Sequence, residues 1–276
     1  MGALRPELAQ ALLEVGNNCD REKYFNQHLQ RYELILSVLQ DLTPVGGRVL
    51  DVGAAPGHIC LALAKAGYAV HGIVYDLQED WEGTPAEDKR FQAAAAKLNL
   101  QLAGCDIQTE DFPFEEGHFD VAVFSEVLEH LWLFPARPVR EIHRVLKPGG
   151  CLVLTTPNAV HLTARLKWLA GRTSFTSLET MLSLPVHMRH NREYTRDEVE
   201  RLLRHCGFEA VRSSFAEWHL WTARKGRSHA FDDRPSWSSA RQWAKLAAFG
   251  LKALHPPLKS GLLAVARKPL ASDLPS

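Results

Sequence analysis

The sequence lacks the features that mark several large classes of protein. No stretch of about 18 apolar residues runs without a charge, so we expect no membrane-spanning helix. The five cysteines lie far apart, and none of them forms a C-x-x-C pair. This spacing argues against a disulfide framework and against a thiolate zinc site, and it favours a reducing compartment.

The sequence also lacks an excess of charge of either sign. Lys and Arg together number 32, Asp and Glu together number 32, and the isoelectric point is about 7.2. No overall electrostatic field therefore attracts nucleic acid or an acidic membrane. We expect no DNA partner, and the neutral charge weighs against RNA as well.

The opening residues lack the pattern of a targeting signal. Glu7 and Glu14 interrupt the apolar region that a secretory signal would need, and Pro6 stands where an N-myristoylation motif has Ser or Thr. We therefore expect a cytoplasmic protein.

The composition that is present is that of an ordinary globular chain. Of the 276 residues, 46% are hydrophobic and 23% are charged, and a chain of this length can bury a large core. Short apolar or β-branched runs alternate with stretches of helical pattern, which predicts βαβ units and a mostly parallel sheet. The expected strands lie at about 47–53, 68–75, 99–104, 118–125 and 150–156, and the expected helices at 20–42, 57–67, 84–98 and 135–146.

The rhythm of the pattern changes after the fifth expected strand. A helix is predicted after Thr195, which with Glu198 forms a capping box, and Gly207 marks its end; a strand follows. We expect an N-terminal helical cap over 1–44 and a main domain over 45–268. Within that domain, 159–190 and 215–260 would elaborate the binding site, and 269–276 would be a tail.

One glycine-rich turn carries the most information about ligand binding. Residues 49–58 read as a buried strand, a tight turn and the start of a helix, with Gly53 and Gly57 in the turn. Such a turn lets a ligand approach the backbone near the free N–H groups of a helix N-terminus. Ala55 and His58 replace two glycines of the dinucleotide pattern, and no Gly-Lys-Ser/Thr ending is present.

Four motifs in order resemble the class I S-adenosylmethionine (SAM)-dependent methyltransferases. They are the turn with Asp51 two residues before Gly53, Cys105-Asp106-Ile107, the stretch from Phe119 to Leu131, and Val145-Leu146-Lys147-Pro148-Gly149-Gly150. The resemblance, which is to enzymes of small molecules, covers roughly 45–158. It implies an α/β fold: a doubly wound, Rossmann-like sheet of seven strands in the order 3-2-1-4-5-7-6, with an antiparallel last strand and SAM across the strand ends.

The resemblance also implies which residues hold SAM. Asp51 and the turn formed by Gly53, Ala54, Ala55 and Gly57 would hold the methionine half, with Asp51 near its ammonium group. Asp106 and Ile107 would contact the adenine, and Phe124 and Ser125 would lie beside the sulfonium. The family's acidic residue that binds the ribose falls on Val74 here, and Asp76 could substitute or could simply begin a solvated acidic loop.

A cluster past the fourth expected strand suggests where the acceptor is activated. Glu126, Glu129 and His130 stand at i, i+3 and i+4, which would place them on one helix face, and His190 lies in the expected acceptor-side loop. Methyl transfer to oxygen needs a group that removes a proton, so His130 and His190 are our candidate catalytic residues.

Two subfamilies resemble this cluster in part. In small-RNA 3′-end 2′-O-methyltransferases, and partly in ubiquinone-pathway O-methyltransferases, such residues contribute to a divalent metal site. The stretches 155–158 and 190–196 match the RNA enzymes, with Tyr194 in place of Trp. Glu126, Glu129, His130 and His190 would suit Mg²⁺, Mn²⁺ or Zn²⁺. Similar stretches occur in general small-molecule methyltransferases with no established metal, and we favour that interpretation.

The acceptor is the least determined feature of the sequence. The layout favours an oxygen of a sugar, a glycan precursor or a natural-product metabolite. RNA 3′-end methylation and a catalytically inactive SAM-binding partner protein stay open as alternatives. The segment 234–268 is basic and amphipathic, so it could rest peripherally on the inner membrane face, or it could pack its aromatic side on the sheet.

Overall fold

The structure is a computed structural model, which describes residues 3–18, 22–75, 89–98, 100–217, 250–270 and 272. The predicted cofactor residue Asp76 and residues 234–249 of the basic segment lie outside the described residues.

A seven-stranded sheet with the predicted order β3-β2-β1-β4-β5-β7-β6 forms the centre of the molecule. The neighbours from β3 to β5 pair in parallel, and β7 runs antiparallel to both β5 and β6. The predicted α/β class and strand order are therefore confirmed. The strands are β1 Arg48–Val52, β2 Ala69–Val74, β3 Gln101–Gly104, β4 Phe119–Ser125, β5 Leu146–Pro157, β6 Glu209–Ala216 and β7 Gly261–Arg267.

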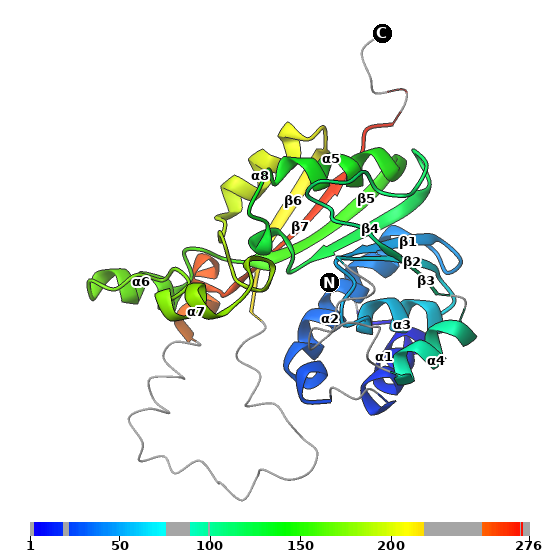
Figure 1. The fold of residues 1–276 in the computed structure, drawn as a ribbon, viewed down its shortest axis with the longest axis horizontal. Helices are drawn as coiled ribbons and strands as arrows, with labels where there is room; N and C mark the ends of the chain where they lie inside the picture. Colours follow the sequence, from blue (N-terminus) through cyan, green and yellow to red (C-terminus); the bar gives the residue numbers. More distant parts are fainter. Residues whose placement is uncertain are drawn as a thin grey trace, which may run out of the picture.

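Helices cover both faces of this sheet (Figure 1). One face packs against α1 Pro6–Asn18, α2 Glu22–Leu42, α3 His58–Lys65 and α4 Lys89–Lys97. The other face packs against α5 Ala136–Val145 and α8 Arg196–His205. Successive residues of a strand pack into the hydrophobic cores on opposite faces of the sheet, because side chains alternate along a strand. Val49 and Leu50 of β1 are an example. This explains why the central strands read as continuous apolar runs.

The start of β5 differs from the expected position. The pattern predicts a strand from residue 150, whereas β5 begins at Leu146. The pairing with β4 jumps from Phe119↔Leu146 to Val121↔Cys151, so the residues before Cys151 form a bulge. Gly149 permits this bulge with a φ of 79°.

The helix before β6 forms as the sequence predicts. Thr195 caps α8 through its side chain, and Glu198 returns a bond to the Thr195 backbone, which completes the capping box. Gly207 follows the helix with a φ of 91°. These local signals suffice because each one is satisfied within a single turn of the chain.

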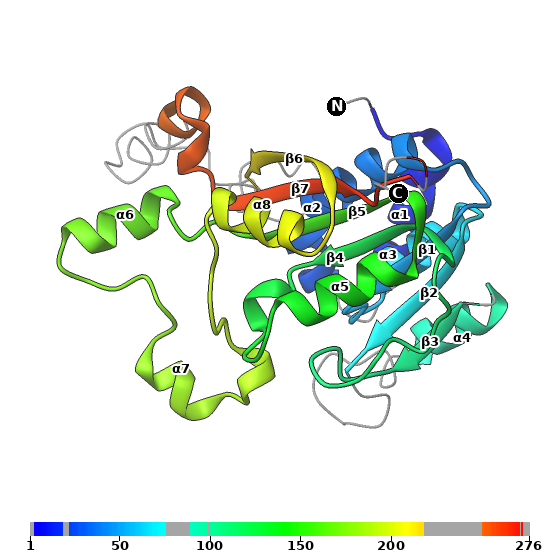
Figure 2. The same cartoon turned by 90° about the horizontal axis from the view of Figure 1, so that it is seen from above.

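The segment between β5 and α8 leaves the sheet at its carboxyl edge (Figure 2). It contains α6 Leu162–Leu169, α7 Leu178–Ser183 and the short turn η2 Val186–Met188. Across the described residues, we find no helix with the length and apolar character needed to cross a bilayer.

The described end of the basic segment is part of the domain core. Pro256–Leu258 forms the turn η4, and Gly261–Arg267 is β7, between β5 and β6. Lys252 pairs with Glu217 at 2.7 Å, and the buried Lys268 donates to the carbonyls of Arg144 and Leu146. These two lysines are therefore engaged within the protein.

Candidate active site

The glycine-rich turn lies between β1 and α3, at the carboxyl edge of the sheet. Gly53 has a φ of 78°, and its N–H and that of Ala54 both donate to the Ile73 carbonyl on β2. A Cβ at Gly53 would overlap the Val127 side chain, and Gly57 begins α3 with a φ of 91°. Both the backbone conformation and the close approach therefore require glycine at position 53.

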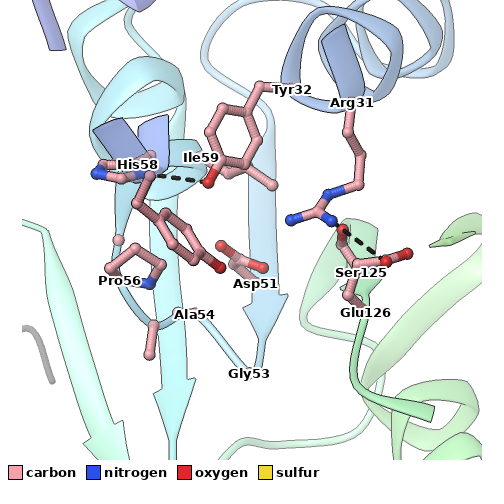
Figure 3. Close-up of a pocket in the computed structure, with 13 residues that line it drawn as sticks. Arg31, Tyr32, Asp51, Gly53, Ala54, Pro56, His58, Ile59, Ser125 and Glu126 are labelled. Atoms are coloured by element: carbon pink, nitrogen blue, oxygen red, sulfur yellow. Dashed lines mark hydrogen bonds and ion pairs between the residues drawn. The ribbon is translucent and has the colours of Figure 1, made fainter. Parts of the chain in front are cut away.

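A small cavity of about 70 Å³ lies against this turn (Figure 3). Arg31 and Tyr32 reach it from α2, and Ser125 and Glu126 close it from the end of β4. Arg31 is buried, and its guanidinium lies 3.2 Å from the Glu126 carboxylate. Burial opposes the charge, but the neighbours, with Glu126 foremost, raise the pKa of Arg31 above its ordinary value. Arg31 therefore stays charged, and within the protein its charge is paired with Glu126 at the cavity wall.

Asp51 lies at the floor of the same cavity. It is only 3% exposed, and the Cys60 thiol donates to its carboxylate at 3.3 Å. Burial raises the pKa of Asp51 to about 6. Within the described part of the chain, no basic side chain lies within ion-pair distance of Asp51. An ammonium group of a ligand would supply the missing partner.

A larger cavity of about 300 Å³ continues from the turn, since Gly53, Ala55 and Glu126 line both. Asp106 and Ile107, after β3, line it, as does Val74 at the end of β2. The Asp106 carboxylate accepts bonds from the Gln108 N–H and the Thr109 hydroxyl, which fix its orientation. Apart from Phe124 and the undescribed Asp76, the predicted cofactor residues thus gather around two connected cavities.

Phe124 does not line either cavity. Its side chain is fully buried in the core beneath α5, among the residues of the second face. The alternation of β4 turns Phe124 into that core and leaves Ser125, at the strand end, to reach the cavity.

Glu126, Glu129 and His130 do not share a helix face, so that expectation is wrong. Glu126 has a left-handed φ of 55° and precedes the three-residue turn η1, Leu128–His130. In this conformation the Glu126 carboxylate pairs with Arg31, and Glu126 is not part of the cluster that Glu129 and His130 form with His190. A short 3₁₀ turn after a left-handed residue does not keep the α-helical spacing on which the expectation depended.

Two adjacent threonines of β5 hold the two glutamates in their separate places. The Thr155 hydroxyl donates to Glu126 at 3.1 Å, and the Thr156 hydroxyl donates to Glu129 at 2.9 Å. Both threonines are fully buried. Neighbouring residues of the strand end therefore each fix a different glutamate of the site.

Glu129, His130 and His190 come together although 60 residues separate the two histidines. Their ligand atoms lie within 4.8 Å of one another, and the two imidazole rings are 5.0 Å apart between centroids. Asn191 joins the two segments, because its N–H donates to the Glu129 carbonyl and its side chain donates to the His130 carbonyl.

The protonation states of this cluster follow from its contacts. The Arg189 carbonyl lies 3.2 Å from His130 Nδ1, so Nδ1 carries the proton and Nε2 presents a lone pair. Burial, reinforced by His190, lowers the pKa of His130 to about 4. Burial also raises the pKa of Glu129, whose Oε1 has no hydrogen-bond partner among the described residues and lies 3.9 Å from His130 Nε2. Two acceptors that face each other leave a place for a proton or a cation.

Sequence reasoning missed the residues that the N-terminal and inserted segments contribute. Tyr24, Arg31 and Tyr32 of α2 line the small cavity, and Tyr24 also lines the larger one. Their spacing of seven and eight residues indicated a common helix face, but nothing local showed what this face covers. His187 and Met188 of η2 also reach the larger cavity.

Comparison with known proteins identifies the family. A family model described as a methyltransferase domain matches residues 24–214. A probable SAM-dependent methyltransferase of Mycolicibacterium smegmatis is 28% identical over 67% of this chain and 60% of its own length. The ubiquinone biosynthesis O-methyltransferase of Methylococcus capsulatus is 37% identical over 45% of this chain and 50% of its own. The matches span 40–60% of the length of these and the other curated relatives.

Solved structures share the fold at low sequence identity. Phosphoethanolamine N-methyltransferase 2 of Haemonchus contortus, solved with SAM, has a TM-score of 0.55 at 18% identity, covering 86% of this chain and 52% of its own. A protein of Galdieria sulphuraria, provisionally described as a sarcosine dimethylglycine methyltransferase, has a TM-score of 0.53 at 16% identity. The match covers 87% of this chain and 86% of that protein. Because the family model covers most of the chain and the strand order agrees, this chain belongs to the class I SAM-dependent methyltransferase family.

Proposed function

We propose that this protein transfers the methyl group of SAM to an oxygen of a small-molecule acceptor, namely a sugar, a glycan precursor or a natural-product metabolite. The observation that carries the proposal is the position of His130. It lines the same cavity as the glycine turn, and its ring lies 5.0 Å from the His190 ring between centroids. The proposed cofactor site and the proposed proton acceptor thus line the same cavity.

The two cavities fit the two halves of SAM. The turn at Gly53 gives the methionine half access to the backbone, Arg31 offers a charge for its carboxylate, and Asp51 offers one for its ammonium. Asp106 and Ile107 provide a carboxylate and an apolar surface for the adenine in the larger cavity. Arg31 joins the predicted residues as a candidate for cofactor binding.

The residues of the site would act mainly by alignment. The acceptor oxygen attacks the methyl carbon, the carbon–sulfur bond breaks, and its electron pair stays on sulfur to give S-adenosylhomocysteine. The hydroxyl proton passes to His130 or His190, which lie on the acceptor side. The sulfonium is a good leaving group, so positioning and proton removal are the tasks left to the protein.

Glu129, His130 and His190 also fit a divalent cation as a donor set, with one carboxylate and two imidazoles. The unpaired Glu129 Oε1 is consistent with this fit. Such a cation would polarise the acceptor oxygen when bound. Glu126 would not take part, because Arg31 and Thr155 engage it.

An oxygen acceptor agrees with the name of the Methylococcus relative, an O-methyltransferase. The test is release of S-adenosylhomocysteine with a panel of hydroxyl-bearing sugars and phenols, each paired with its O-methylated form. We expect turnover with at least one free hydroxyl compound and none with its blocked partner. Turnover only with RNA 3′ ends would favour the RNA alternative, and tight SAM binding without any turnover would favour an inactive partner protein.

A further inference from the structure

The α6–α7 segment stands apart from the two hydrophobic cores. Ala164 is the one buried residue of α6, and α7 has none. In Figures 1 and 2 the two helices extend beyond the sheet, at the end of the molecule away from α1 and α4. The segment therefore does not form a core of its own.

Exposed apolar side chains concentrate on this segment. Leu169 is 85% exposed, Leu182 is 79% exposed and Phe175 is 75% exposed. Single exposed apolar residues are common on soluble proteins, but a concentration of them marks an interaction surface. Eight large apolar residues between positions 166 and 184 are exposed, and we call them the α6–α7 surface: Leu166, Trp168, Leu169, Phe175, Leu178, Met181, Leu182 and Leu184.

Positive charge accompanies this apolar surface. Arg165, Lys167 and Arg172 are exposed, and residues 159–190 contain one acidic residue, Glu179. Among the residues that the structure describes, no carboxylate lies within ion-pair distance of these three cations. Apolar side chains beside unpaired basic ones complement an anionic lipid surface, which takes up both.

The α6–α7 surface is continuous with the wall of the active-site cavity. The chain passes from α7 directly into η2, where His187 and Met188 line the larger cavity. The His187 ring stacks on Tyr75 at the end of β2, 5.3 Å between centroids. A molecule at the η2 end of the α6–α7 surface would therefore lie next to the larger cavity.

We propose that the α6–α7 surface docks on an anionic lipid bilayer, and that the acceptor is an amphiphile which enters the cavity from that bilayer. The second part rests on the proposed methyltransferase function. The first does not, because docking involves neither SAM nor the histidines. This surface differs from the basic segment 234–268, in which two of the three described lysines, Lys252 and Lys268, are engaged within the protein.

Vesicle co-sedimentation of the full chain, without SAM or acceptor, tests the docking. Vesicles of phosphatidylcholine alone are compared with vesicles that also contain phosphatidylglycerol, at about 0.1 M and about 1 M salt, where the Debye length falls from about 10 Å to about 3 Å. We expect binding to the anionic vesicles at least about tenfold stronger than to the neutral ones, with part of it lost at high salt.

Two double variants separate the apolar and the charged contributions. Leu169→Glu with Leu182→Glu removes apolar contact, and Lys167→Glu with Arg172→Glu reverses charge. Each should weaken binding to anionic vesicles by roughly tenfold or more. Their matched controls are Leu13→Glu on α1, an exposed leucine away from the surface, and Arg201→Glu with Arg204→Glu on α8. Both controls should bind as the wild type does.

Three results would overturn the proposal: equal sedimentation with neutral and anionic vesicles, loss of binding in the controls to the same extent, or no binding by a folded protein. Unchanged SAM titration and thermal unfolding of each variant show that it is folded. Light scattering identifies the competing case, in which the surface holds a second copy of this chain. In that case the protein would not sediment with the vesicles, and the apolar double variant would convert a dimer into monomers. A failure of docking would leave the methyl-transfer assay with soluble acceptors unaffected.

Discussion

The proposed cofactor end of the site and its proposed acceptor end are built in different ways. At the cofactor end, Asp51 stands in the central strand β1, and Gly53 and Gly57 belong to the short turn that follows it. At the acceptor end, His130 and His190 come from segments 60 residues apart, one of which is continuous with the exposed α6–α7 surface. The proposed cofactor end thus follows a single strand, whereas the proposed acceptor end combines the turn after β4 with a distant segment.

The two ends therefore differ in how strictly they restrict the residue type at each position. The turn needs a positive φ and a close backbone approach, which leave little freedom in residue type. The acceptor end needs only that side chains converge, and segments of many lengths and sequences can achieve this. Binding of the common cofactor is thus expected to be insensitive to changes at the acceptor end.

The largest effect is expected at the turn. Gly53→Ala should abolish detectable SAM binding, because the new methyl group overlaps Val127 in addition to the strain of a positive φ. Isothermal titration calorimetry measures the binding. Gly117→Ala is the matched control, since Gly117 also has a positive φ but has open space around it. Equal SAM affinity in both variants would place the cofactor elsewhere.

The next effect concerns the acceptor end alone. His130→Ala should lower kcat by roughly 10²–10⁴-fold while the Kd for SAM changes little, since the lost group serves proton removal. His205→Ala, an exposed histidine of α8, is the control and should retain full activity. A parallel loss of SAM affinity in His130→Ala would show that the two ends are not independent.

Chelation distinguishes two forms of that effect. If the cluster of Glu129, His130 and His190 holds a divalent cation, exhaustive chelation should reduce turnover as strongly as His130→Ala does, and elemental analysis should find about one metal ion per chain. Full activity of a chelated, metal-free protein would leave proton removal by histidine as the mechanism.

A smaller, pH-dependent effect is expected at the cofactor end. The pKa of Asp51 is about 6 in the free protein, and binding of an ammonium group favours its ionised form. Affinity for SAM should therefore be full above pH 6 and fall as the pH drops through 6, by about tenfold between pH 7 and pH 5. Calorimetry across this range measures it. Asp51→Asn should bind weakly with a flat profile, and a sloping profile in that variant would assign the titration to another group.

The smallest effect is expected on stability, at the cap of α8, which lies outside both ends of the site. Thr195→Ala should lower the free energy of unfolding by about 1 kcal/mol, because it removes the cap of α8. Thr163→Ala, at an exposed position of α6, should change it by less than about 0.5 kcal/mol. Denaturant titration gives both values. A change in SAM affinity of Thr195→Ala would indicate that α8 packing transmits to the cofactor end.

Much of the geometry around the turn could be predicted because its signals are local. The turn after β1, the alternation of strands and helices, and the capping box of α8 each depend on residues a few positions apart. The left-handed Glu126 and the role of Phe124 were missed for a related reason. One residue of conformational change at a strand end redirects every side chain beyond it, and sequence spacing does not report that change.

The sequence by itself determined the fold class, the strand order implied by the family motifs, and the turn with Asp51, Gly53 and Gly57. Only the tertiary structure decided that Arg31 of α2 reaches that turn, that Thr155 and Thr156 divide Glu126 from Glu129, and that Asn191 brings His190 to His130. The physical reason is the range of the interactions. Backbone conformation and periodicity are fixed by near neighbours, whereas ion pairs and hydrogen bonds between distant segments exist only after the chain has packed.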